Sequence, residues 1–168
     1  VLWSMSESST NIIVVNSIST LGREEGDECS IFHSDDDANE TADPFTCYDF
    51  LHALEKSGSV GESTGWIPYH LAAFNKNKLV GAVPLYLKSN SQGEYIFDHN
   101  WAHAFERAGG RYYPKLQISV PFTPVTGRRL LISKNAPNNT ASLLLQSAIG
   151  LCKQLSLIHI SEPTRPSI

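Results

Sequence analysis

The sequence has few cysteines, no block of Lys or Arg and no long apolar run. Its three cysteines, Cys29, Cys47 and Cys152, are too few and too widely spaced for a disulfide framework or a CxxC metal site. We therefore expect reduced thiols and a cytoplasmic location. A net charge of −4 without a basic cluster gives no footprint for nucleic acid. No stretch approaches the roughly 20 apolar residues of a membrane helix.

What is present is the composition of a globular domain, with 41% hydrophobic and 18% charged residues. The last segment is different in kind. Residues 155–165, LSLIHISEPTR, resemble codon for codon the translation of a transposase-type sequencing adapter, and such segments are set apart from fold reasoning. We expect a first strand plus an acidic flexible loop over 1–43, a partial domain over 44–154 and a non-native tail over 155–168. The chain is then a fragment.

Hydrophobic periodicity predicts an α/β domain. The acidic, Gly- and Ser-containing stretch 19–43 predicts a loop. Thr46 predicts an N-cap, paired with Asp49, for a helix that ends at Ser57-Gly58. The polar turn 75–78 between two apolar runs predicts a hairpin. The predicted strands are 12–15, 69–74, 79–87, 95–97 and 115–120, and further helices are predicted over 99–108 and after Asn138 or Asn139.

An aromatic and charged stretch between residues 94 and 115 is the first candidate for a binding surface. Arg107 and Arg111 offer guanidinium groups to a carboxylate or phosphate, and the Tyr and Trp side chains offer flat walls with a polar tip. In the alternative interpretation, the aromatic rings pack in the core and the charges are solvated. The candidate substrate-binding residues are Glu94, Tyr95, Asp98, Trp101, Glu106, Arg107, Arg111, Tyr112, Tyr113 and Lys115.

A second candidate, for a cofactor, is the turn that contains Val125, Gly127, Arg128 and Arg129. Its glycine permits close approach of a ligand to the backbone, and its two arginines suit a pyrophosphate. The alternative is a tight turn beside a sheet.

Metal sites are not expected. His99 and His103 stand four residues apart, as two zinc ligands on one helix face would. However, Asn100 holds the position of the glutamate in an HExxH protease, and no third ligand is evident, so surface histidines are favoured. The acidic run 35–37 lacks the ligand spacing and glycine of a calcium loop.

The chain also resembles a known family through long, ordered motifs. The family comprises GNAT-type N-acetyltransferase-like proteins labelled as peptidoglycan biosynthesis proteins, and it is similar to the Fem-type peptidyltransferases. The resemblance covers about residues 43–150. The matching segments are 43–45, 50–60, 64–66, 68, 70–71, 79–88 (LVGAVPLYLK), 93–98 (GEYIFD), 106–109, 111–116 (RYYPKL) and 120–127 (VPFTPVTG).

The resemblance implies a tandem of GNAT-like domains, of which this chain holds most of the first. The implied fold is a mixed sheet flanked by helices, truncated before the fifth core strand. An acyl-CoA donor would lie along residues 115–122, the 125–129 turn and the helix after Asn139. The usual glycine pattern of the pyrophosphate loop is not reproduced cleanly in this sequence.

The implied function is transfer of an acyl or aminoacyl group to a small-molecule or peptide amine. Such a reaction needs a base to deprotonate the amine and donors to hold the acyl carbonyl. Glu94, Asp98 and Glu106 are possible bases, and none of them is singled out by the sequence. The truncated chain itself is expected to be inactive. The alternative is a non-catalytic module of the same fold that recognises a peptide or glycan.

Overall fold

The computed structural model describes residues 9–32, 41–94, 98–157 and 160–161. The predicted strand 95–97 and the acidic run 35–37 lie outside these ranges. The helices are α1 (Arg23–Ser30), α2 (Tyr48–Lys56), α3 (His99–Arg107) and α4 (Thr140–Gln154), with two 3-10 turns, η1 (Ile18–Thr20) and η2 (Glu62–Thr64). The strands are β1 (Asn11–Val15), β2 (Ile31–Phe32), β3 (Thr41–Ala42), β4 (Trp66–Pro68), β5 (His70–Asn75), β6 (Lys78–Val83), β7 (Leu85–Lys88), β8 (Lys115–Ile118), β9 (Leu131–Ile132) and β10 (Ile160–Ser161).

One long, bent hairpin connects the two main sheets. Its first arm is β4 followed by β5, and its second arm is β6 followed by β7. Lys76 and Asn77 turn the chain with φ values of 48° and 65°, as the predicted polar turn requires. Pro84 separates β6 from β7, because proline has no N–H for the strand ladder. The hairpin therefore runs through both sheets, in the orders β1-β5-β6-β9 and β10-β8-β7-β4.

β8 and β9 pair with the two halves of the same hairpin arm. Ile118 lies opposite Leu85, and Leu131 lies opposite Ala82, so the intervening residues 119–130 form an excursion out of the sheet. β10 pairs in parallel with β8. It lies in the segment that the sequence sets apart as a tail, at a sheet edge where no further strand is predicted.

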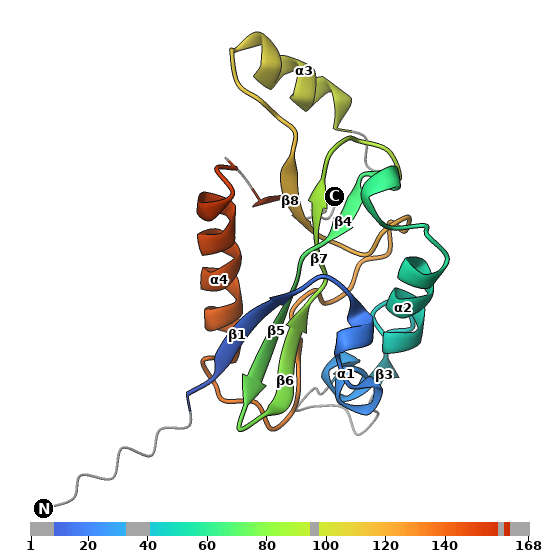
Figure 1. Ribbon diagram of the computed structural model, residues 1–168, viewed down its shortest axis with the longest axis vertical. Helices are drawn as coiled ribbons and strands as arrows, with labels where there is room; N and C mark the ends of the chain where they lie inside the picture. The colour runs from blue at the N-terminus through green and yellow to red at the C-terminus, as the bar shows by residue number, and fades with distance from the viewer. Residues whose placement is uncertain (1–8, 33–40, 95–97, 158–159, 162–168) are drawn as a thin grey trace, which may run out of the picture.

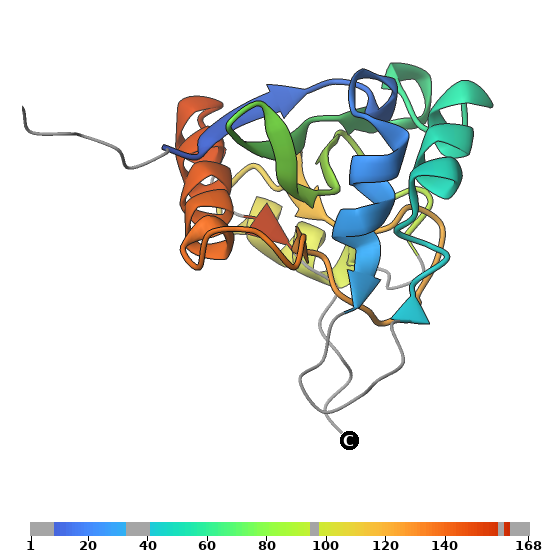
Figure 2. The same cartoon turned by 90° about the horizontal axis from the view of Figure 1, so that it is seen from below.

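Helices cover both faces of the sheets (Figures 1 and 2). α4 packs on one face, where Leu144 and Ala148 meet Leu85, Leu116 and other apolar residues in a continuous core. α1 and α2 lie on the opposite face, which has its own apolar cluster. α3 forms as predicted and stands at one end of the molecule (Figure 1).

The loop predicted over 19–43 is wrong for residues 23–30, which form α1. Its sequence, REEGDECS, carries little apolar periodicity, so its place against the sheet comes from a few contacts such as fully buried Cys29. The predicted cap of α2 is also wrong. Thr46 bonds back to Asp43, and the first N–H of α2, from Tyr48, is bonded to Asp27 of α1 at 2.8 Å.

A largely buried carboxylate, 12% exposed, joins α2 to the sheet. Glu55 accepts hydrogen bonds from the Ser17 hydroxyl (2.7 Å), the Ile18 N–H (3.0 Å) and His70 Nε2 (3.0 Å). His70 Nδ1 accepts the N–H of Leu85, which fixes the tautomer that donates to Glu55. Burial raises the pKa of Glu55, but its hydrogen bonds outweigh burial and lower the pKa overall. Glu55 thus ties η1, α2 and β5 together.

We predict that Glu55→Ala lowers the free energy of unfolding by about 3 to 5 kcal/mol, because it leaves buried donors without an acceptor. Glu62→Ala is the matched control, since Glu62 is exposed on η2. Denaturant titration of both variants is the measurement. Equal losses in the two variants would contradict the role given to Glu55.

Candidate functional site

The polar candidate site lies on the sheet face opposite α4. Strand alternation turns Leu85, Leu87, Leu116 and Ile118 toward the α4 core. The intervening residues form two cross-strand pairs on the other face, Tyr86 opposite Gln117 and Lys88 opposite Lys115. All four of these side chains are buried. Two lysines facing each other across neighbouring strands repel, so this arrangement needs compensating groups.

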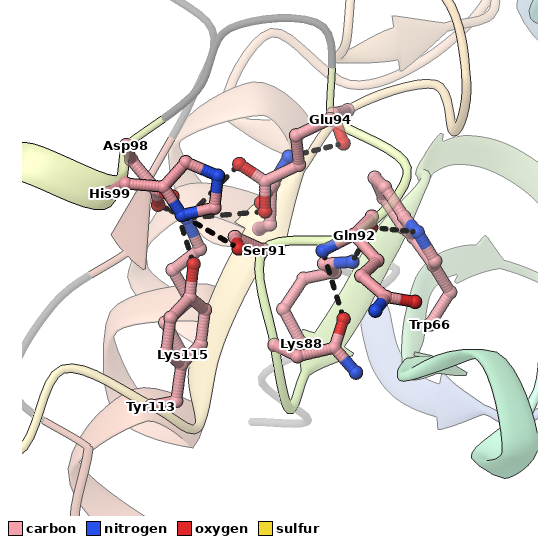
Figure 3. A network of polar contacts seen from close by, with 12 residues as sticks. Trp66, Lys88, Ser91, Gln92, Glu94, Asp98, His99, Tyr113 and Lys115 are labelled. Atoms are coloured by element: carbon pink, nitrogen blue, oxygen red, sulfur yellow. Dashed lines mark hydrogen bonds and ion pairs between the residues drawn. The ribbon is translucent and has the colours of Figure 1, made fainter. Parts of the chain in front are cut away.

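Lys115 has its compensating groups close by (Figure 3). Its ammonium forms ion pairs with Asp98 and with Glu94, the latter at 3.4 Å. Asp98 also accepts a hydrogen bond of 2.9 Å from the Tyr113 hydroxyl and one from Tyr112. Burial raises the pKa of Asp98, but these bonds and the Lys115 charge outweigh it, and the pKa falls below its ordinary value. The cluster pins the start of α3 to β8.

Lys88 has a different environment. Its ammonium donates to the backbone carbonyl of Gln92 at 2.7 Å and lies 3.8 Å from the centroid of the Trp66 ring. Trp66 Nε1 donates to the same carbonyl at 3.0 Å. Burial lowers the pKa of Lys88 to about 8, and the charge of Lys115 acts in the same direction. The charges of Glu94 and Asp98 raise the pKa less strongly, so Lys88 loses its proton nearer to neutral pH than an exposed lysine does.

Glu94 is the carboxylate whose charge is stabilised least. Burial raises its pKa, and the charge of Asp98 adds to the increase, while Lys115 and Lys88 lower it less strongly. Its Oε1 atom is buried and accepts no hydrogen bond. Its closest charged neighbour is the Lys115 ammonium, at 3.4 Å. A carboxylate with a raised pKa and an oxygen that accepts no hydrogen bond has the properties of a general base.

Two further buried polar atoms on this face accept or donate no hydrogen bond. They are the Tyr86 hydroxyl and Gln117 Oε1. The Tyr86 ring packs edge-on against the rings of Trp66 and His70, with centroid distances of 5.4 and 4.9 Å. The amide nitrogen of Gln117, Nε2, donates to the Ser119 hydroxyl at 3.1 Å. Each unpartnered buried group costs about 1 to 3 kcal/mol, a cost that binding sites retain because a ligand removes it.

The structure brings together half of the predicted substrate-binding set. Glu94, Asp98, Tyr112, Tyr113 and Lys115 form the cluster described above, while Tyr95 lies outside the described residues. The other members are exposed: Trp101 (75% exposed), Glu106 and Arg107 on α3, and Arg111 beyond it. Neither predicted interpretation holds alone, because the charges of Glu94, Asp98 and Lys115 are buried, whereas Trp101 and the remaining charges are exposed.

The predicted cofactor-binding turn lies in the 119–130 excursion. Arg128 donates to the Ser30 carbonyl at 3.0 Å, and Arg129 donates to the carbonyls of Val125 and Arg128. Arg129 is 7% exposed. A side chain at Gly127 would meet the Asp43 carboxylate at 2.8 Å, so the turn packs closely against the segment before α2. The guanidinium groups of Arg128 and Arg129 therefore already donate hydrogen bonds to backbone carbonyls.

Sequence reasoning missed Trp66, Lys88, Gln92 and Gln117. The signal was present in the alternation of LYLK (85–88) and KLQI (115–118), which places a lysine on the non-α4 face of each strand. Register decides that the two lysines are opposite each other, and register is a tertiary property. The 2.7 Å contact between Lys88 and Gln92 depends on the 89–94 turn and has no sequence signature.

In the described part of the chain, no three His, Cys, Asp or Glu side chains gather as metal ligands would, and no helix there has the length and apolarity to span a bilayer. His99 instead contacts the Ser91 hydroxyl at 3.2 Å.

Comparison with protein families decides the affiliation. The FemAB-like family, described as peptidoglycan biosynthesis/recognition, matches residues 17–162. The chain belongs to this family. No curated protein sequence matches the chain.

Solved structures show which fold this FemAB-like chain has. An aminoglycoside N-acetyltransferase, AAC(6')-Iy in complex with CoA, superposes with a TM-score of 0.53 at 10% identity, covering 98% of this chain and 82% of that one. A ribosomal-protein-alanine N-acetyltransferase from Brucella melitensis biovar Abortus 2308 gives 0.47 at 9% identity, covering 95% and 82%. The superposition on the first of these, at a TM-score of 0.53, shows that the FemAB-like chain has a GNAT-like fold, as the family resemblance implies.

We predict that Asp98→Ala lowers the free energy of unfolding by about 3 to 5 kcal/mol, because buried Lys115 then keeps its charge without its main partner. Adding Lys115→Met to this variant should recover part of the loss, since the unpaired charge is removed. Glu106→Ala, at an exposed position of α3, is the control. Denaturant titrations that show simple additivity of Asp98→Ala and Lys115→Met would contradict the coupling.

Proposed function

We propose that this protein transfers an acyl or aminoacyl group to an amine acceptor. The observation that carries the proposal is the buried Oε1 of Glu94, which accepts no hydrogen bond and lies beside the Lys115 ammonium, in a chain with a GNAT-like fold. The FemAB-like affiliation agrees with this class of reaction. The acyl donor and the amine acceptor of the protein are likewise proposed.

Glu94 is the proposed base. An amine attacks an acyl carbonyl only through its nitrogen lone pair, so an ammonium acceptor must first lose a proton. Glu94 Oε1 takes this proton, and its raised pKa brings the carboxylate closer to the pH at which it works. Before this proton transfer, the ammonium of Lys115 stabilises the charged form of the Glu94 carboxylate. Asp98 suits this role less well, because both of its oxygens already accept hydrogen bonds.

The proposed donor is acyl-CoA, which when bound would supply the acyl group as a thioester. The proposed anchor for its pyrophosphate is the start of α4, where the N-cap Asn139 makes no side-chain capping bond. The Thr140 N–H already donates to the Pro137 carbonyl, so the anion would meet the next N–H groups of the first turn. Val125 and Gly127 would approach a ligand through their backbone. Arg128 and Arg129 could contact it only by exchanging their present carbonyl partners.

The test is an acyl-transfer assay with acetyl-CoA and a panel of primary amines, following release of the CoA thiol. Glu94→Gln should lower kcat by about 10²- to 10⁴-fold, the usual contribution of a general base. Glu106→Gln is the matched control, because Glu106 is exposed on α3 and outside the cluster.

Equal rates for Glu94→Gln and the unmodified protein would remove Glu94 from the mechanism. Saturable binding of an amine or peptide without acyl-CoA binding or turnover would instead favour the recognition module.

A further inference from the structure

The site contains a buried cation without a counter-ion. Lys88 is 0% exposed, yet among the described residues no carboxylate oxygen lies within 4.0 Å of its ammonium. Both nearby carboxylates, Glu94 and Asp98, are ion-paired with Lys115 instead. The contacts of Lys88 are a neutral carbonyl and the face of Trp66. A buried ammonium with only these partners is stabilised poorly and gains from an anion.

The same site contains a buried carboxylate oxygen without a hydrogen-bond donor. Glu94 Oε1 is one of the unpartnered atoms of the described residues, and Gln117 Oε1 is another acceptor on the same face. Acceptors of this kind are satisfied by N–H groups, and an ammonium supplies up to three. The site therefore holds a cation without a counter-ion together with a carboxylate oxygen that accepts no hydrogen bond, although this oxygen lies 3.4 Å from the Lys115 ammonium.

We propose that the site binds a small zwitterion of the amino-acid class, with its amine on Glu94 Oε1 and its carboxylate on the Lys88 ammonium. The inference rests on the proposed function, because it names the class of acceptor that Glu94 would deprotonate. The ligand carboxylate gives the Lys88 ammonium a counter-ion, and the ligand amine gives Glu94 Oε1 a hydrogen-bond donor. A ligand with only one of these two groups can satisfy only one of the two protein atoms.

Binding exchanges one partner of Lys88 for another. The Gln92 carbonyl contacts the ammonium at 2.7 Å, so the ligand carboxylate takes its place and Gln92 moves aside, while Glu94 keeps its ion pair with Lys115. The exchange is favourable because a charge-assisted hydrogen bond is roughly twice as strong as one to a neutral acceptor. The Trp66 ring keeps its contact with the Lys88 ammonium.

Titration calorimetry with matched probes tests the inference without any acyl donor. The probes are glycine, β-alanine and 4-aminobutyrate, compared with propylamine, which has only the amine, and propionate, which has only the carboxylate. At least one amino acid should bind about tenfold more tightly than either one-headed probe. Equal affinities across the series would overturn the inference.

Lys88→Met is the decisive variant, because methionine keeps an unbranched apolar stem in the core and removes the charge. In this variant the preference for the amino acid over propylamine should disappear, while affinity for propylamine stays within about twofold. Lys56→Met, at an exposed position of α2, is the control and should retain the preference. A preference that survives in Lys88→Met would contradict the role of Lys88.

Proton uptake provides an independent readout. Lys88 faces Glu94, Lys115 and Asp98, and its pKa of about 8 leaves it partly deprotonated at pH 8. A bound carboxylate raises that pKa, so binding at pH 8 should take up protons, seen as a dependence of the heat on buffer ionisation enthalpy. No uptake in the unmodified protein would contradict the contact. Acyl transfer to propylamine alone would leave the proposed function standing while this inference fails.

Discussion

The buried ammonium of Lys115 is the constraint on which the candidate site depends. An isolated ammonium on this sheet face would cost several kcal/mol, so folding must bring carboxylates to it. Two carboxylates form ion pairs with this ammonium: Asp98, at the start of α3, and Glu94, at the end of the 89–94 segment. In doing so they fix where α3 leaves the body of the protein and where the segment covering Lys88 lies. Lys115 thus organises chain segments on both sides of residues 95–97.

Two buried charge networks on this side of the sheet have different consequences. At Glu55, the carboxylate receives donors from η1 and β5, and its pKa falls. That network is closed and stabilises the fold. At Glu94 and Lys88, the charges are buried with incomplete partners, and both pKa values move toward neutrality. Incomplete satisfaction of this kind stores free energy that a ligand or a proton transfer can release.

The sequence predicted those elements whose signals are local. The 75–78 turn, the alternation of β8 and the length of α3 each depend on residues within the element itself. α1 was missed because its apolar face is small and its stability comes from the sheet beneath it. The start of α2 was misassigned because its cap comes from Asp27, a contact between segments distant in sequence.

The candidate site was predicted in part for the same reason. Residue type pointed to Glu94, Asp98, Tyr113 and Lys115, but also to Trp101, Glu106, Arg107 and Arg111, which are exposed. Composition cannot separate the two groups, because the contacts of Lys115 with Glu94 and Asp98 join segments that only the folded chain brings together. Lys88 became visible only when that register placed it opposite Lys115.

The central claim is that the Lys115 cluster is a poised acid–base site rather than a closed structural ion pair. A carbon-13 NMR titration of the Glu94 carboxyl, assigned through Glu94→Gln, tests it most directly. Because burial disfavours the charged form, the account predicts a pKa above the ordinary value of about 4.3 for a glutamate. A midpoint at or below that value would mean that Lys115 fully stabilises the carboxylate, and Glu94 would then be a structural partner and not a base.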